Sequence, residues 1–215
     1  IRHSSNILHF MTKIQKLDLL LAIYIAAIVA AELMGGKIFT INNLVNASVG
    51  IFVIPLTFSI NDIVTEVYGK EKARGFIKIG LIILMGLTLY ILLALVLPPA
   101  KRFLANEAAY QLIFAKSLRI TLASLTAFFI SERLDVYIFS KIREKLGHKQ
   151  LWFRNNVSNF LSMFFDTTIF MFLAFYAPGD FRFIVSLIWP YWLLKCSYSV
   201  LHTPFTYLGV SWLKK

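Results

Sequence analysis

The chain has 215 residues, of which 58% are hydrophobic and only 15% are charged, and its formal net charge is +11. A soluble domain carries about 25% charged residues, so this composition excludes an ordinary water-soluble domain and indicates a membrane protein. The basic charge leaves nucleic-acid binding as an alternative, which the positions of the charges decide below. The single cysteine, Cys196, excludes an intrachain disulfide.

The apolar runs, taken in chain order, predict an all-α membrane protein in which one bundle of six transmembrane helices forms a single domain over residues 1–215. The predicted spans cover residues 17–34, 44–61, 76–97, 113–131, 157–177 and 183–211. Residues 76–97 form the clearest span, because about 20 apolar residues are enough to cross a hydrocarbon core of roughly 30 Å. Short connections are expected over 35–43 and 100–112, and Pro55 predicts a kink in the second span because it removes a backbone hydrogen bond.

Lys and Arg collect on one side of this predicted topology. Six spans place both termini on the same side, and that side carries 15 of the 22 Lys and Arg residues, against four on the other side and three within the spans. Because such residues collect in cytoplasmic loops, both termini are expected in the cytoplasm. The same rule accounts for the basic net charge, so no nucleic-acid partner is expected.

The first predicted span carries a stripe of small residues and one acidic residue. Ala22, Ala26 and Ala30 recur every four residues, a spacing that lets another helix approach closely. The stripe fits either helix packing within the chain or the docking of a coupling module. Glu32, near the end of the span, fits either the outer boundary of the membrane or an intramembrane functional group.

Carboxylates also lie at the ends of the second and fourth predicted spans. Asp62 and Glu66 are one helical turn apart, just before a basic cluster, and Glu132 and Asp135 share a helix face at i, i+3. Ionisable groups inside a membrane are costly and are candidates for function. The alternative is that these four residues lie at the inner boundary, in water.

A polar stripe follows the fifth predicted span. Its members, at i, i+4, i+7 and i+11, are Asn155, Asn159, Ser162 and Asp166. At about 100° per residue they lie on one narrow face of a helix. A polar stripe that ends in a carboxylate indicates the wall of a cavity, whereas hydrogen bonding between helices is the alternative.

Lys195 lies in the middle of the last predicted span. Its helix face also carries Tyr191, Ser199, His202 and Thr206. An ammonium group at that depth needs a counter-charge, and Asp166, Asp135 and Asp62 are the candidates. A purely structural ion pair and a pair that borders a binding site are both consistent with the pattern.

The motifs of common enzyme classes are missing from the sequence. It contains no Gly-x-Ser-x-Gly elbow, no His-Glu-x-x-His, no P-loop and no His/Cys spacing typical of a metal site. An intramembrane enzyme would also need a nucleophile paired with a base. The chain is therefore predicted not to be an enzyme, with no catalytic residue, no metal and no cofactor.

Four stretches of the sequence resemble one family of transporters. They are IPLTFSINDIVTEVYGKEKAR, SLTAFFISERLDVYIFSKIREK, LWFRNNVSNFLSMFFDTTIFMFLAF and LLKCSYSVLHTPFTYL. In this order, across residues 20–210, they look like the queuosine-precursor transporters, also called the vitamin uptake transporters. The resemblance implies a six-helix, multi-pass protein of the bacterial inner (cytoplasmic) membrane. It also implies a fold similar to the substrate-binding components of energy-coupling-factor transporters.

The resemblance further implies a substrate and a set of polar positions. The substrate would be a 7-deazaguanine: the nitrile or the aminomethyl precursor of queuosine (preQ0 or preQ1), or queuine. The family pattern places its polar positions on Asp62, Arg119, Asp135, Ser158, Asp166, Lys195 and Pro204. Two residues depart from that pattern, because the family often has Gln where this chain has Glu132, and many members have Gln where it has Met163.

A deazaguanine suits such residues chemically. Adjacent N–H donors on its Watson–Crick edge suit a carboxylate, its carbonyl oxygen needs a donor, and its flat ring stacks on aromatic side chains. The predicted substrate-binding residues are Asp62, Arg119, Glu132, Asp135, Asn155, Asn156, Ser158, Asn159, Asp166 and Lys195. Among them, Glu132, Asp135 and Asp166 are expected to read the base, and Lys195 and Arg119 to orient the carboxylates or meet the carbonyl. The candidate stacking partners are Phe58, Tyr68, Trp189, Tyr191 and Trp192.

Two functions are compatible with these features. The predicted one is a stand-alone transporter that imports queuosine precursors by alternating access. The alternative is the substrate-binding subunit of an ATP-driven uptake system of the energy-coupling-factor type, for a vitamin-like small molecule. The expected partners are a purine analogue and the lipid bilayer, with a coupling module in the second case, and a homodimer is compatible with both.

Overall fold

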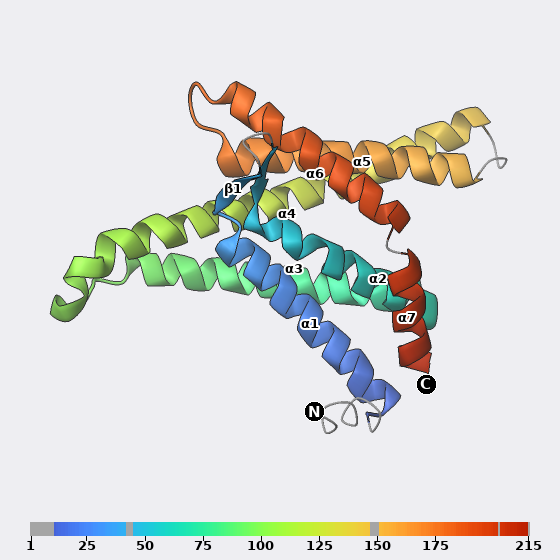
Figure 1. Ribbon diagram of the computed structural model, residues 1–215, viewed down its shortest axis with the longest axis horizontal. Coiled ribbons are helices and arrows are strands. Elements are labelled where there is room, and N and C mark those ends of the chain that lie inside the picture. The colour runs from blue at the N-terminus through green and yellow to red at the C-terminus, as the bar shows by residue number, and fades with distance from the viewer. Residues whose placement is uncertain (1–10, 42–44, 147–150, 202, 215) are drawn as a thin grey trace.

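A computed structural model describes residues 11–41, 45–146, 151–201 and 203–214 of the chain (Figure 1). Helices dominate this part of the chain. They are α1 (Lys13–Met34), α2 (Ile54–Tyr68), α3 (Lys70–Val96), α4 (Leu104–Leu146), α5 (Leu151–Phe175), α6 (Phe181–Leu201) and α7 (Thr203–Lys214). The shorter elements are the strands β1 (Ile38–Ile41) and β2 (Val45–Ser48) and the 3-10 helices η2 (Val49–Phe52) and η3 (Lys101–Phe103).

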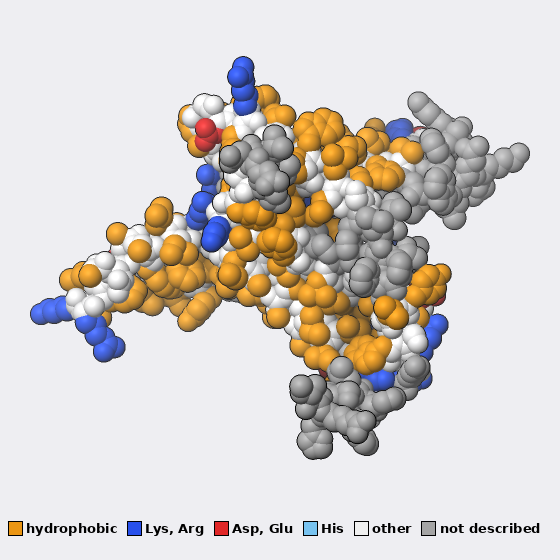
Figure 2. Space-filling view, in the orientation of Figure 1, with side chains coloured by type: hydrophobic (Ala, Val, Ile, Leu, Met, Phe, Trp, Pro, Cys, Tyr) orange, Lys and Arg blue, Asp and Glu red, His pale blue; other side chains and the backbone are white. Residues whose placement is uncertain are grey.

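The helices present an apolar exterior. Within the described residues, the segments long and apolar enough to cross a membrane are Lys13–Met34, Val49–Tyr68, Glu71–Val96 and Lys101–Ser131, and Phe160–Phe175 is a shorter apolar helix. Figure 2 shows hydrophobic side chains over most of the visible face, with Lys and Arg in small groups, most of them at the edges and one on the face itself. Such large apolar surfaces mark contact with a membrane. The prediction of a helical, multi-pass membrane protein is confirmed, and the number of six spans stays a prediction.

A β-hairpin replaces the short loop that was predicted after the first span. β1 and β2 pair antiparallel, with Ile38 opposite Ser48 and Ile41 opposite Val45. Three of these four residues are β-branched, which favours extended backbone. The second apolar segment consequently begins at Val49 rather than at residue 44, and it continues beyond residue 61 to Tyr68.

The hairpin is held against α6 and the end of α1. The Tyr191 hydroxyl donates a hydrogen bond to the Ser48 carbonyl at 3.0 Å and accepts one from the Ser48 N–H at 2.6 Å. The Ser48 hydroxyl donates to the carbonyl oxygen of Gly35 at 2.6 Å. These bonds are buried, so they satisfy backbone groups that water cannot reach.

α4 is longer than its predicted span of residues 113–131. It runs without a break from Leu104 to Leu146, so most of the predicted polar connection over 100–112 is helical. Its 43 residues extend about 65 Å, roughly twice the thickness of a hydrocarbon core. Figure 1 shows α4 crossing the molecule from the α3–α4 connection at the left to the start of α5 at the upper right.

The last predicted span, residues 183–211, is two helices. α6 ends at Leu201 and α7 begins at Thr203. Pro204 lies in the first turn of α7, where proline is favoured because its missing N–H needs no partner within the helix. α7 packs on α2, and a Cβ atom at Gly209 would overlap the side chain of Ile63.

The beginning of α1 and the end of α7 lie side by side. The Lys16 ammonium donates a hydrogen bond to the Trp212 carbonyl at 3.0 Å, and Figure 1 places the start of α1 and the end of α7 at the same end of the molecule. One apolar core joins α1, α2, α3 and α7 around Phe76 and Val64. Another joins β2, α5 and α6 around Met171 and Leu187.

Gly69, between α2 and α3, has backbone angles that only glycine adopts readily. Its φ is 85° and its ψ is 167°, a region where other residues cost about 1–3 kcal/mol. We therefore expect Gly69→Ala to lower the free energy of unfolding by about this amount, measured by denaturant titration in detergent. A Cβ atom at Gly69 would meet nothing within 4 Å, so backbone strain alone would be the cause.

Gly75, inside α3, is the matched control for this substitution. A Cβ atom there would likewise meet nothing within 4 Å, but the backbone is helical. Gly75→Ala is expected to raise the free energy of unfolding by about 0.5–1 kcal/mol. Equal effects of the two substitutions would contradict the role of the Gly69 backbone.

Candidate functional site

A cavity of about 430 Å³ lies between α1, α2, α4, α5, α6 and the hairpin. Its volume falls within the roughly 300–1,000 Å³ of small-molecule sites. Its aromatic lining consists of Tyr24, Phe58, Phe128, Phe170 and Tyr191. Its polar lining consists of Glu32, Ser48, Thr57, Asn61, Ser124, Asp166, Thr167 and Lys195. Apolar walls with a few convergent polar groups are typical of a site for a small ring compound.

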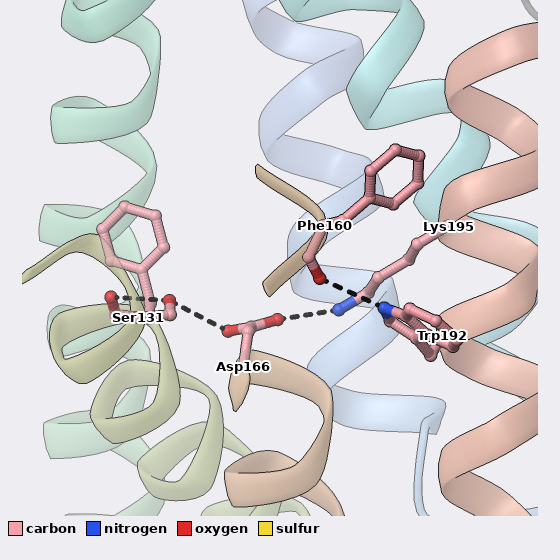
Figure 3. A network of polar contacts seen from close by, with 6 residues as sticks. Ser131, Phe160, Asp166, Trp192 and Lys195 are labelled. Carbon is pink, nitrogen blue, oxygen red and sulfur yellow. Dashed lines mark hydrogen bonds and ion pairs between the residues drawn. The ribbon is translucent and has the colours of Figure 1, made fainter. Parts of the chain in front are cut away.

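An ion pair joins two helices at this cavity. The Lys195 ammonium on α6 lies 2.7 Å from Oδ2 of Asp166 on α5, and their side chains are 13% and 28% exposed. The Ser131 hydroxyl on α4 donates to the other carboxylate oxygen at 3.3 Å. Figure 3 shows the Asp166 carboxylate between the Ser131 hydroxyl and the Lys195 ammonium. Of the three candidate counter-charges for Lys195, the structure pairs it with Asp166.

This pair gives the cavity a hydrogen-bond donor and an acceptor side by side. Neutralisation by Asp166 lowers the cost of holding an ammonium group within the bundle. Because both residues also line the cavity, each retains a face toward a ligand. An ammonium has three donors and a carboxylate about four acceptor positions, so each keeps hydrogen-bonding capacity beyond the pair itself.

Two further polar residues come from α1 and α2. Glu32 is 7% exposed, and Ser124 of α4 hydrogen-bonds to its carboxylate. Asn61 is hydrogen-bonded to the Tyr24 hydroxyl. Neither residue was among the predicted substrate-binding residues. Glu32 is buried in the cavity wall, close to the end of α1. The signal that could have identified it is its position as the acidic residue at the end of an otherwise apolar run.

A second cavity, of about 210 Å³, adjoins the first between α1, α3 and α4. The residues that line both are Tyr24, Ala31, Glu32, Thr57, Ile77, Ser124 and Phe128. The remaining lining of the smaller cavity is apolar. Glu32 therefore lies in the wall that both cavities share.

The structure does not bring Arg119 to the main cavity. Its guanidinium donates to two carbonyl oxygens at the end of α5, to Leu173 at 2.8 Å and to Tyr176 at 2.6 Å. It lines a separate, shallower pocket together with Leu173. A cation at the last carbonyl groups of a helix satisfies them and is favoured by the helix dipole, so this position indicates a structural role.

The other predicted substrate-binding residues fall into two groups. Asp62 is partly buried on α2 and does not line the main cavity. The remaining side chains lie outside the part of the chain that the structure describes, although their backbones belong to α4 and α5. These are the side chains of Glu132, Asp135, Asn155, Asn156, Ser158 and Asn159. Their contact with substrate stays a prediction.

The predicted stacking residues are divided in the same way. Phe58 and Tyr191 line the cavity. Tyr68 and Trp189 are 39% and 51% exposed and face elsewhere, and the Trp192 indole donates to the Phe160 carbonyl at 3.2 Å (Figure 3). Tyr24, Phe128 and Phe170 take their place in the lining, and nothing in an apolar sequence distinguishes them from lipid-facing aromatics.

We expect Arg119→Gln to affect stability and not ligand affinity. Loss of the two bonds to the end of α5 should lower the free energy of unfolding by about 1 kcal/mol, because the guanidinium is exposed. Affinity for a deazaguanine, measured by calorimetry, should remain within about twofold. Arg182→Gln, at the exposed start of α6, serves as control, and a tenfold loss of affinity in Arg119→Gln would instead place Arg119 at the substrate.

Comparison with known proteins supplies the family. A family model described as "Putative vitamin uptake transporter" matches residues 48–209. A protein named "Probable queuosine precursor transporter" from Bacillus subtilis (strain 168) is 32% identical over 164 residues, which cover 75% of this chain and 70% of that protein. No solved structure matches the chain, so the likeness to energy-coupling-factor components stays a prediction.

Two other relatives carry the same activity in their names. The "Queuosine precursor transporter" of Escherichia coli (strain K12) is 27% identical over 131 residues, covering 61% of this chain and 56% of the relative. The "Probable queuosine precursor transporter" of Haemophilus influenzae (strain ATCC 51907 / DSM 11121 / KW20 / Rd) is 26% identical over 132 residues, covering 61% of this chain and 53% of the relative. The matched region spans just over half the length of these two proteins.

Proposed function

Because this chain belongs to the family described as putative vitamin uptake transporters, we propose that it imports queuosine precursors of the 7-deazaguanine class across the bacterial cytoplasmic membrane. The family is one of transporters, so the chain is a transporter and not an enzyme. The names of the relatives support queuosine precursors as the substrate.

The observation that carries the proposal is the cavity containing the Asp166–Lys195 pair. A deazaguanine is a flat ring with N–H donors and a carbonyl acceptor on its edge. The cavity offers aromatic side chains to the ring, carboxylate oxygens to the N–H groups and an ammonium group to the carbonyl. Between the helices of the bundle, both faces of such a ring would be removed from contact with water. Burial of this apolar surface favours binding.

The proposed topology has six spans, with both termini in the cytoplasm. In it, α6 is the sixth span, and α7 is too short to cross a hydrocarbon core of roughly 30 Å. The contact between Lys16 and Trp212, at the start of α1 and the end of α7, supports termini on one side. The excess of Lys and Arg on that side supports the cytoplasm.

A second candidate function is that of a binding subunit for an ATP-driven coupling module. It is favoured by the exposure of Ala22 and Ala26 on α1. Their neighbour Ala27 is 5% exposed and packs inside, so the exposed part of the stripe is not used by the chain itself. A partner helix could approach α1 closely there.

The proposal is tested by queuosine formation in cells that cannot synthesise it. Expression of the chain should allow external nitrile or aminomethyl precursor, or queuine, to appear as queuosine in tRNA, and control cells should show none. Absence of queuosine with all three compounds, from cells that place the chain in the membrane, would contradict import of this class by the chain alone.

Transport into liposomes separates the two candidate functions. Purified chain that moves a labelled precursor without any other protein would establish a stand-alone transporter. Chain that binds the precursor but does not move it would favour the coupled subunit. In the coupled case, Ala26→Leu should block assembly with the module while binding of the precursor remains.

A further inference from the structure

Three polar atoms, each on a residue that lines the main cavity, are buried and have no hydrogen-bond partner among the residues that the structure describes. They are Oε2 of Glu32, Oδ1 of Asn61 and Oγ1 of Thr167, on α1, α2 and α5. A buried polar atom that nothing satisfies destabilises the structure that holds it. Their convergence on one cavity indicates that a polar ligand supplies the missing bonds.

The chemical nature of these atoms restricts the ligand. A carboxylate oxygen and an amide carbonyl oxygen are acceptors only, so the ligand must present hydrogen-bond donors to α1 and α2. Ser124 and Tyr24, which hydrogen-bond to Glu32 and to Asn61, occupy other positions on these side chains and hold them in place. The two acceptors are therefore held in place before a ligand arrives, which reduces the cost of binding.

The Asp166–Lys195 pair adds a complementary group to the same cavity. Lys195 supplies donors, and its side chain lines the cavity as those of Glu32 and Asn61 do. A ligand with two donors on one edge and a carbonyl acceptor next to them would satisfy all three residues. A 2-amino-6-oxo ring has this pattern, because its exocyclic amine and ring N–H are adjacent and the N–H lies beside the carbonyl.

We propose that Glu32 and Asn61 are the residues that read the 2-amino group and the ring N–H of the substrate, with the ring carbonyl turned toward Lys195. This inference rests on the proposed function. It assigns selectivity for guanine-type rings to α1 and α2, whereas Glu132, Asp135 and Asp166 were expected to read the base. A ring without the 2-amino group leaves one acceptor buried and unpaired, and a site built for a hydrogen bond rejects the analogue that lacks it.

The test compares two neutral compounds on the purified, full-length chain in lipid nanodiscs. They are 7-cyano-7-deazaguanine and 7-cyano-7-deazahypoxanthine, which differ only by the 2-amino group. The unmodified chain should bind the first about 10- to 100-fold more tightly in calorimetry. Glu32→Gln, which keeps the shape and removes one acceptor, should lose about the same factor for the first compound and bring the two affinities close together.

A second variant and a control keep the test decisive. Asn61→Ala should reduce the preference in the same direction, and it decides the matter if Glu32→Gln does not give a monodisperse, cooperatively melting protein. Glu66 is an exposed carboxylate on α2. Glu66→Gln removes the same charge as Glu32→Gln and should leave both affinities unchanged. If Glu32→Asp keeps part of the preference that Glu32→Gln loses, this would further support a carboxylate that accepts a hydrogen bond from the ring edge.

Three outcomes would overturn the inference. If Glu32→Gln and Asn61→Ala both keep the full preference for the 2-amino compound, other residues recognise the ring edge. The proposed function would still stand. In a parallel titration with 7-aminomethyl-7-deazaguanine, a loss in Glu32→Gln confined to this compound would show that Glu32 meets its ammonium group rather than the ring edge. Failure of the unmodified chain to bind any of the deazaguanines would remove the proposed function, and this inference with it.

Discussion

Replacing Asp166 by Asn is expected to reduce uptake of queuosine precursors at least about 100-fold, because it removes the charge that both neutralises Lys195 and faces the cavity. Breaking a fully buried ion pair costs about 3–5 kcal/mol. Since the two side chains are 13% and 28% exposed, a loss of about 2 kcal/mol in the free energy of unfolding is expected instead. Uptake in cells and denaturant titration in detergent measure the two effects.

The double variant Asp166→Asn with Lys195→Met separates structure from function. Removal of both charges should restore most of the stability, since no unpaired charge remains in the bundle. Uptake should stay low, because the cavity then lacks the ammonium donor and the carboxylate of the pair. Normal uptake by the double variant would show that the pair is only structural.

The ion pair between Lys141 and Glu144 on α4 provides the matched control for charge removal. Its nitrogen and oxygen lie 3.0 Å apart, but the side chains are 53% and 64% exposed. Exposed pairs of this spacing contribute about 0.3–0.5 kcal/mol. Glu144→Gln should therefore change neither stability nor uptake measurably.

Replacing Tyr191 by Phe is expected to lower the free energy of unfolding by about 2–4 kcal/mol, because it leaves both backbone groups of Ser48 without their partner. Ser48 is 5% exposed, so water does not readily replace the hydroxyl. The phenyl ring keeps the apolar packing of Tyr191 in the core that joins β2, α5 and α6. Denaturant titration measures the loss, and faster proteolysis within the hairpin would locate it.

Tyr90→Phe is the matched control, because Tyr90 on α3 is 70% exposed. It also removes a phenol hydroxyl, but one that does not bond to the Ser48 backbone, so stability should change by less than about 0.5 kcal/mol. Because Ser48 and Tyr191 both line the cavity, uptake should fall together with the stability of the hairpin in Tyr191→Phe. Unchanged stability would mean that the hairpin is held by its apolar contacts alone.

The third membrane helix and the break before α7 can be predicted from local features of the sequence. The length and apolarity of residues 76–97 determine a membrane helix, because lipid leaves the backbone no other way to satisfy its hydrogen bonds. α3 indeed ends at Val96, before Pro98. Pro204 marks a break in the same way, although hydropathy alone joins α6 and α7 into one run.

Local features do not account for the hairpin or for the length of α4. The sequence predicts a loop over residues 35–43 and a membrane segment from residue 44, whereas the extended form of β1 and β2 depends on their pairing with each other and on Tyr191, which is 143 positions from Ser48. α4 continues through polar residues after Leu104 and after Ser131. Helix propensity and the long contact with α5 favour this continuation, whereas hydropathy marks only the part in lipid.

The sequence by itself determined that this chain is a helical membrane transporter of a particular family and that Asp166 and Lys195 are polar residues within its bundle. Only the tertiary structure decided which groups share a cavity: it joins Asp166 to Lys195, adds Glu32 and Asn61 from the first two membrane helices, and directs Arg119 to the end of α5. The reason is physical. Periodicity places a side chain on a face of its own helix, but the neighbour that this face meets depends on how helices distant in sequence pack together.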